Sequence, residues 1–149
     1  MRFRPIEALV VAVVLVAGLA VLYGPALQEG LPRVSGDVFD GRIFIAVLEH
    51  WYGVVLELNA PLSPNHFYPF PYTLSYGDGL MFGGLVYAIP RSLGFDPFVS
   101  QEITNAVVYA IGFIATYLVA RRLLGVSVVL ALFAALVELL ANSLAIRAL

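Results

Sequence analysis

Three long runs of apolar residues constrain the fold of this chain more than any other feature of its sequence. The runs cover residues 6–27, 103–124 and 126–146. A helix rises ~1.5 Å per residue and the hydrocarbon core of a bilayer is ~30 Å thick, so each run can cross it as a helix. Of all residues, 61% are hydrophobic and 12% charged. The sequence therefore predicts an all-α integral membrane protein with about three transmembrane helices, forming a single membrane domain over residues 1–149.

Paired arginines predict how the chain is oriented. Arg2 and Arg4 precede the first run, and Arg121 and Arg122 end the second. The positive-inside rule places both pairs in the cytoplasm. Residues 28–102 then lie on the outer side, in agreement with their holding eight of the ten acidic residues. We expect a multi-pass protein of the cell's inner (plasma) membrane with a cytoplasmic N-terminus.

The first run could instead be a signal peptide, because a basic stretch precedes it. Its apolar part is longer than the ~7–15 residues of a signal peptide, and no small-residue cleavage pattern follows it. We therefore expect residues 6–27 to be retained as a membrane helix.

The outer segment, residues 28–102, contains two further helical patterns. The spacing of apolar residues predicts an amphipathic helix over residues 40–58, with Asp40 as its N-cap and with Arg42 and Glu49 on its polar face. Such a helix next to a span is expected to lie in the interface, with its apolar face in lipid. The run 80–90 is too short to span and predicts a re-entrant or interfacial helix, or one buried against other helices. The apolar face of the longer helix comprises Phe44, Val47, Leu48, Trp51, Val55 and Leu58.

The stretch between these two helices, residues 61–80, contains four prolines, which exclude a regular helix there. Its aromatic residues suit the headgroup region of a bilayer, where a ring is buried and a hydroxyl stays in water. Asp78 stands between two glycines and is expected in a turn or at a helix cap. The aromatic residues are Phe67, Tyr68, Phe70, Tyr72 and Tyr76.

Several classes of function lack their signatures. The chain has no phosphate-binding glycine loop, no dinucleotide fingerprint and no zinc-protease motif. It has no cysteine, which excludes disulfides, thiolate metal sites and cysteine nucleophiles. A formal net charge of -2 gives no indication of a nucleic-acid partner. His50 and His66 could join carboxylates around a metal ion, but no ligand spacing requires it.

Four short motifs occur in order along the outer segment. They are G-D-x-x-D-G-R at residues 36–42, L-E-H at 48–50, F-Y-P at 67–69 and T-L-S-Y-G-D at 73–78. Over about residues 33–125, this order resembles the N-terminal part of bacterial polytopic membrane proteins related to the glycosyltransferase C superfamily. In these proteins one span leads into an outer loop with acidic residues, then into juxtamembrane helices and many further spans.

The resemblance implies sugar transfer from a polyprenyl-phosphate donor on the outer face of the membrane. A carboxylate in the first loop would act as general base on the acceptor hydroxyl, with Asp40 the first candidate and Asp37 the second. Arg42 is the nearest cation for the charge of the departing phosphate. Three further side chains would line the cleft, or hold a divalent cation if one is used: Glu49, His50 and Asp78.

The resemblance also implies that this chain needs more spans than its own three. We expect a truncated product or one piece of a split protein, inactive alone, whose partners are the bilayer, the polyprenyl-phosphate sugar and a missing membrane partner or C-terminal portion. Two alternatives remain: a small non-catalytic scaffold or subunit, and a transporter component. A transporter should have broken spans or polar residues at the midplane, and only Glu138 fits. Because Glu138 costs about 2.5–3.5 kcal/mol to insert, we expect it to face a bundle interior with Asn142 as partner.

Overall fold

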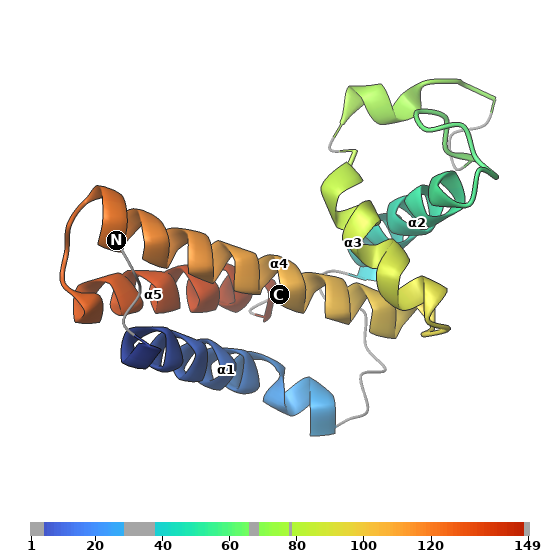
Figure 1. The fold of residues 1–149 in the computed structure, drawn as a ribbon. Coiled ribbons are helices and arrows are strands. Elements are labelled where there is room, and N and C mark those ends of the chain that lie inside the picture. The colour runs from blue at the N-terminus through green and yellow to red at the C-terminus, as the bar shows by residue number, and fades with distance from the viewer. Residues whose placement is uncertain (1–4, 29–37, 66–68, 78, 148–149) are drawn as a thin grey trace. The chain divides into compact units, whose positions relative to one another are not determined.

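The computed structural model of the chain describes residues 5–28, 38–65, 69–77 and 79–147, and only the backbone at 25–28, 38–40 and 142–147. The described residues form helices and no strand, which confirms the all-α prediction (Figure 1). The elements are α1 (Pro5–Gln28), α2 (Val38–Val55), η2 (Thr73–Tyr76), α3 (Met81–Ser92), α4 (Pro97–Leu118), η3 (Val119–Leu123) and α5 (Val128–Arg147).

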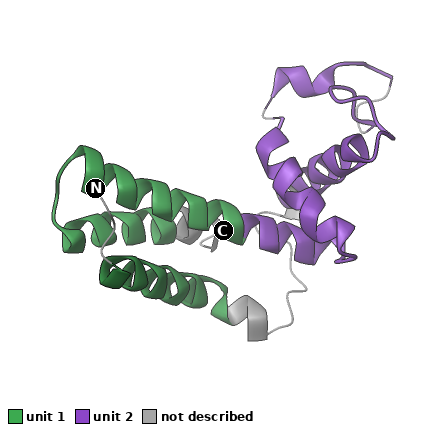
Figure 2. Cartoon of the chain, viewed as in Figure 1, with its two compact units in different colours: residues 1–30, 106–149 green, residues 31–105 purple. Residues whose placement is uncertain are grey.

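The chain divides into two compact units (Figure 2). Unit 1 comprises residues 1–30 and 106–149, and unit 2 comprises residues 31–105. The units are described separately below. That both belong to one membrane domain stays a prediction.

Two helices are long and apolar enough to cross a membrane, Pro5–Gly24 and Pro97–Leu123. Only 11% and 22% of their most apolar stretches are buried in the structure. A core helix of a soluble protein would be mostly buried. The third predicted span coincides with α5, whose apolar part over the residues searched is the shorter stretch Val128–Ala141. A third crossing therefore stays a prediction.

The second of these helices begins earlier than residue 103, where the apolar run was expected to start. The carboxylate Oδ1 of Asp96 accepts hydrogen bonds from the backbone N–H groups of Phe98 (2.8 Å) and Val99 (3.1 Å). Pro97 follows as the first helical residue, where its missing N–H costs nothing. The helix start is thus set by a cap and not by the onset of hydrophobicity. At its other end α4 widens into the π-helical turn η3.

Unit 1 is built from α1, the second part of α4, η3 and α5 (Figure 1). Gly18 of α1 faces α5, and a Cβ there would lie 2.6 Å from Cδ2 of Leu139. A small residue at this point lets the two helices approach closely, as is common between membrane helices. The buried core of the unit comprises Leu22, Phe113, Tyr117, Ala120, Ala131, Ala135 and Leu139.

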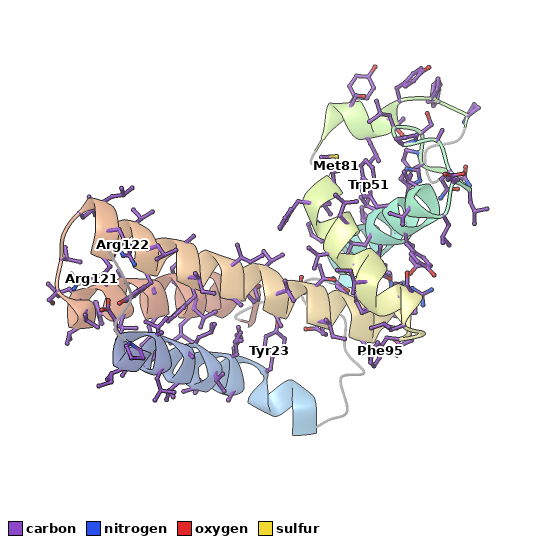
Figure 3. All side chains as sticks on the ribbon, viewed as in Figure 1. Tyr23, Trp51, Met81, Phe95, Arg121 and Arg122 are labelled. Atoms are coloured by element: carbon purple, nitrogen blue, oxygen red, sulfur yellow. The ribbon has the colours of Figure 1, made fainter. Side chains whose placement is uncertain are left out.

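A polar contact also joins α1 to the end of α4. Oε1 of Glu7 accepts hydrogen bonds from the Tyr117 hydroxyl (2.7 Å) and from Nε of Arg121 (3.3 Å). Arg121 also donates from Nη1 to the Val126 carbonyl (3.3 Å). Figure 3 shows Arg121 and Arg122 at this end of the unit. The acidic residue that opens the first apolar helix is thereby paired inside the protein.

Glu138 of α5 lies toward α4, as the cost of burying a carboxylate in lipid led us to expect. A Cβ on Gly112 of α4 would be 2.8 Å from Oε1 of Glu138, so glycine provides the space for this carboxylate. Asn142, its predicted partner, has a side chain outside the described residues.

In unit 2, both predicted ends of the helix 40–58 were wrong, since α2 covers Val38–Val55. α2 begins at Val38, so Asp40 lies in the first helical turn and not at the N-cap. α2 ends at Val55, because Glu57 adopts the left-handed conformation (φ 59°) and the Leu58 N–H bonds to the Gly53 carbonyl (2.9 Å). This closing turn is a common way to end a helix, although glycine usually takes the left-handed position.

The apolar face of α2, expected to lie in lipid, is partly covered by protein. Val47, Leu48 and Trp51 are all buried, and Trp51 donates from Nε1 to the Gly79 carbonyl. α3 lies beside α2 (Figure 1) and packs on this face through Gly84. An amphipathic pattern shows that a face is apolar but not whether lipid or another helix covers it. Phe44, Val55 and Leu58, from the same predicted face, remain exposed.

The contact between α2 and α3 can be tested at two adjacent glycines. A Cβ on Gly84 would lie 2.7 Å from Cδ1 of Trp51 and closer to its Cβ and Cγ, whereas one on Gly83 would lie 3.5 Å from Cδ2 of Leu48. We expect Gly84→Ala to separate the helices and lower the free energy of unfolding by about 1–3 kcal/mol.

Gly83→Ala is the matched control, since it gains the same helix propensity, about 1 kcal/mol, in ordinary van der Waals contact. Denaturant unfolding followed by the fluorescence of Trp51, the single tryptophan, measures both. Equal stability of the two variants would contradict the close packing at Gly84.

Candidate functional site

The carboxylates of the predicted site fall largely outside the described part of the structure. Asp37 and Asp78 lie outside the described residues altogether. Asp40 is placed by its backbone in the first turn of α2, and its side chain is not described. Their roles as base and as substrate contact therefore stay predictions.

Arg42 lies exposed on α2, close to the N-terminal turn that contains Asp40. A helix N-terminus carries a partial positive charge, which favours carboxylates and phosphates near it. Seven residues separate Arg42 from Glu49, which corresponds to ~10 Å along the helix axis. The two side chains were expected on one polar face, and about two helical turns separate their positions on it.

Glu49 is held by three donors from α3. Its Oε1 accepts hydrogen bonds from the Tyr87 hydroxyl (2.5 Å) and from Nε of Arg91 (2.5 Å), and its Oε2 accepts one from Nη2 of Arg91 (3.4 Å). Arg91 also donates from Nη1 to the Phe95 carbonyl (2.6 Å). Its guanidinium lies 5.2 Å from the ring centre of Tyr52. This Glu49–Tyr87–Arg91 cluster joins α2, α3 and the loop before α4.

The surroundings of the cluster keep its two hydrogen-bond donors, Tyr87 and Arg91, in their protonated forms. Tyr87 is completely buried, and burial, reinforced by the hydrogen bond to Glu49, raises the pKa of its hydroxyl far above the ordinary value. The hydrogen bond to Glu49 likewise raises the pKa of Arg91, outweighing the opposite effect of burial. At neutral pH the tyrosine therefore keeps its proton and the arginine its charge. A carboxylate with these donors already in place is poorly suited to act as a general base.

His50 is buried, with 7% of its surface exposed. Its Nε2 lies 3.1 Å from the Pro61 carbonyl, and because a carbonyl only accepts, this nitrogen is the donor. The backbone carbonyl of His50 accepts a hydrogen bond from Nδ2 of Asn59 (3.2 Å). Glu49 and His50 are thus neighbours in sequence with separate sets of partners.

The described residues searched contain no group of three or more His, Asp or Glu side chains that could hold a metal ion. His66, Asp37 and Asp78 lie outside that set. A divalent cation as a cofactor of this chain stays an untested prediction.

Tyr87, Arg91 and Tyr52 were not predicted as site residues. A usable signal was present, since Arg91 is the single charged residue between Leu80 and Phe95. A charged side chain on so apolar a helix needs a partner of opposite charge, and Glu49 is the half-buried carboxylate of the preceding helix. The sequence does not say that α2 is the helix on which α3 packs.

Polar residues are also buried in unit 2 at the start of α4. Thr104 donates from Oγ1 to the Ser100 carbonyl (2.7 Å), which satisfies its hydroxyl within the helix. Gln101 is 4% exposed, and its Oε1 has no hydrogen-bond partner among the described residues. The first turns of α4 therefore bury polar side chains within unit 2.

Comparison with known families, curated proteins and solved structures gives no match to this chain. We therefore define the candidate site from the residues of this chain alone. It consists of the N-terminal turns of α2 together with the Glu49–Tyr87–Arg91 cluster.

The raised pKa of Tyr87 gives a test by pH. A group whose pKa is higher in the folded state stabilises the fold fully below its unfolded pKa, here 10.0, and loses that contribution as the pH rises further. We expect the free energy of unfolding to fall above pH 10 by up to about 1.4 kcal/mol per pH unit through this tyrosine.

Tyr87→Phe is the control for the other tyrosines. It should be less stable than the parent by about 1 kcal/mol at neutral pH and lack this part of the alkaline decline. Unfolding curves measured by Trp51 fluorescence from neutral pH to pH 11 give both quantities. The same pH dependence in parent and variant would show that Tyr87 is not held as described.

Proposed function

We propose that the chain is the N-terminal membrane portion of a glycosyltransferase-like protein, which transfers a sugar from a polyprenyl-phosphate donor on the outer face of the inner membrane. The observation that carries this proposal is the exposed Arg42 in the first turns of α2, two residues after Asp40 in the G-D-x-x-D-G-R motif. A cation for phosphate and a carboxylate for a hydroxyl are the two groups that this transfer needs most.

Membrane insertion with three spans and a cytoplasmic N-terminus is part of the proposal. Support comes from two helices with membrane-crossing length and mostly exposed apolar surfaces. Further support comes from Glu7 of α1, which bonds to Tyr117 of α4 and to Arg121 of η3. These bonds favour a retained helix over a cleaved signal peptide, because cleavage would leave Arg121 without this carboxylate.

The contacts of the other predicted residues refine their roles. Glu49 is engaged by Tyr87 and Arg91, so it supports the site and leaves the base to Asp40 or Asp37. His50 is buried and bonds to the Pro61 carbonyl. We propose that further membrane helices, from a partner or from a longer chain, enclose the lipid of the donor and exclude water from the reacting centre.

A non-catalytic scaffold or subunit is the second candidate. The observation that favours it is that Glu49 and His50, two of the predicted site residues, have structural partners. The scaffold keeps the membrane placement of the chain and lacks the sugar transfer.

The proposed orientation predicts the result of reporter fusions. Because arginine pairs lie before α1 and at the end of α4, a reporter fused at Asn59 should be outside the cytoplasm and one fused at Gly125 inside it. Paired phosphatase and fluorescent-protein fusions measure this. The opposite pattern would remove the proposed site, since the resemblance implies that the donor is used on the outer face.

The proposed base predicts an effect on turnover. In this chain joined to further spans that give activity, Asp40→Asn should lower turnover about 10²-fold or more if its carboxylate is the base. Stability should change by no more than about 0.3–1 kcal/mol, because asparagine loses only the favourable charge at the helix N-terminus. Transfer of radiolabelled sugar from a polyprenyl-phosphate donor measures turnover.

Glu57→Gln, which removes an exposed carboxylate just beyond the other end of α2, is the matched control and should leave turnover unchanged. If neither Asp40→Asn nor Asp37→Asn changes turnover, these two carboxylates are solvated surface groups without a catalytic role. That result favours the scaffold hypothesis.

A further inference from the structure

The exposed side of α3 is apolar along its whole length. Met81, Phe82, Leu85, Ile89 and Leu93 are each more than half exposed. At 100° per residue they fall within an arc of about 120°. We call these five residues the α3 outer face.

The opposite side of α3 makes the contacts with α2. Gly84 lies against Trp51, and Tyr87 and Arg91 bond to Glu49. The one charged residue of α3 is therefore turned away from the outer face. Ser92 falls within the outer arc, but its hydroxyl donates to the Ala88 carbonyl (2.7 Å), which leaves no unsatisfied donor there.

The segment leading into α3 also exposes aromatic side chains. Phe70, Tyr72 and Tyr76 are between 62% and 89% exposed. Figure 3 shows side chains of this segment projecting away from α2 and α3. Tyr72 and Leu80 have left-handed backbone conformations (φ 61° and 47°), which are uncommon for residues other than glycine. Exposed tyrosines on a fixed backbone suit the headgroup region, where the ring is buried and the hydroxyl stays in water.

α3 is also in direct contact with the start of a helix that can span the membrane. The Tyr87 hydroxyl lies 3.4 Å from the Pro97 carbonyl, and Arg91 donates to the Phe95 carbonyl. Pro97 is the first residue of the helix that continues to Leu123. If this helix crosses the bilayer as proposed, α3 is held next to the residues at which it enters.

We propose that the α3 outer face lies in the boundary between the headgroups and the acyl chains of the bilayer, with α3 parallel to the membrane plane. α3 is too short to cross the hydrocarbon core, and one apolar face with charge on the other is the pattern of an interfacial helix. The sequence predicted an interfacial position for residues 40–58 and left it as one of three alternatives for residues 80–90; the proposal selects it for α3. The inference rests on the membrane placement in the proposed function and is independent of sugar transfer.

The chain has no cysteine, so single labelling sites can be introduced directly. The probes are spin labels on Phe82→Cys, Leu85→Cys and Ile89→Cys, in the full chain reconstituted into vesicles of phosphatidylcholine and phosphatidylglycerol. We expect each label to be more accessible to oxygen than to a water-soluble nickel chelate, at similar depth for all three because the helix is parallel to the surface. Matched controls on the exposed positions Glu57→Cys and Asn65→Cys should show the opposite accessibility.

Three results would overturn the inference. Labels on α3 as accessible to nickel as the Glu57 control would place this face in water. Labels shielded from both reagents would mean that a protein covers it. A steep increase in depth from Phe82 to Ile89 would describe a re-entrant helix. Unchanged emission of the buried Trp51 verifies in each variant that unit 2 is folded.

Labels on the exposed Val13 and Val16 of α1 separate this inference from the proposed function. Lipid contact at α1 with water contact at α3 overturns the inference alone. Water contact at both overturns the membrane placement and the proposed function with it. Lipid contact at both supports the inference, whether or not the chain joined to further spans transfers sugar.

Discussion

The arrangement of unit 2 depends on the pairing of the Glu49 carboxylate with Tyr87 and Arg91. Buried or half-buried charges need partners, and in a chain with few charges those partners determine which elements meet. Glu49 accepts hydrogen bonds from Tyr87 and Arg91, and Arg91 reaches on to the loop that caps α4. Unit 1 uses the same principle, since Glu7 of α1 is paired by Tyr117 and Arg121. Apolar contact then fills the remaining space between the helices.

The helical class could be predicted because apolar runs and helical periodicity are local properties of a sequence. Helix ends were predicted less well, because capping decides them. Asp96 and Pro97 start α4 ahead of its apolar run, and Glu57 ends α2 although it is not glycine. The covering of the α2 face could not be predicted, since lipid and a second helix require the same apolar pattern. Gly84 and Trp51 meet only through tertiary packing.

The sequence supplied the residue types of the candidate site but not the partners of each side chain. Arg42 is exposed, as a phosphate contact requires. The resemblance placed Glu49 and His50 with it in one cleft, and the structure gives them separate partners in Arg91 and the Pro61 carbonyl. A residue's chemistry can be read from its type, but its availability depends on which donors reach it.

The left-handed residues between α2 and α3 have a consequence for how this connection responds to change. Glu57, Tyr72 and Leu80 each hold a conformation that costs a side-chain-bearing residue about 1–2 kcal/mol. The left-handed conformations at these positions are therefore maintained by tertiary contacts and not by the intrinsic backbone preferences of the three residues. Glycine at these three positions would relieve strain, whereas a β-branched residue would add to it.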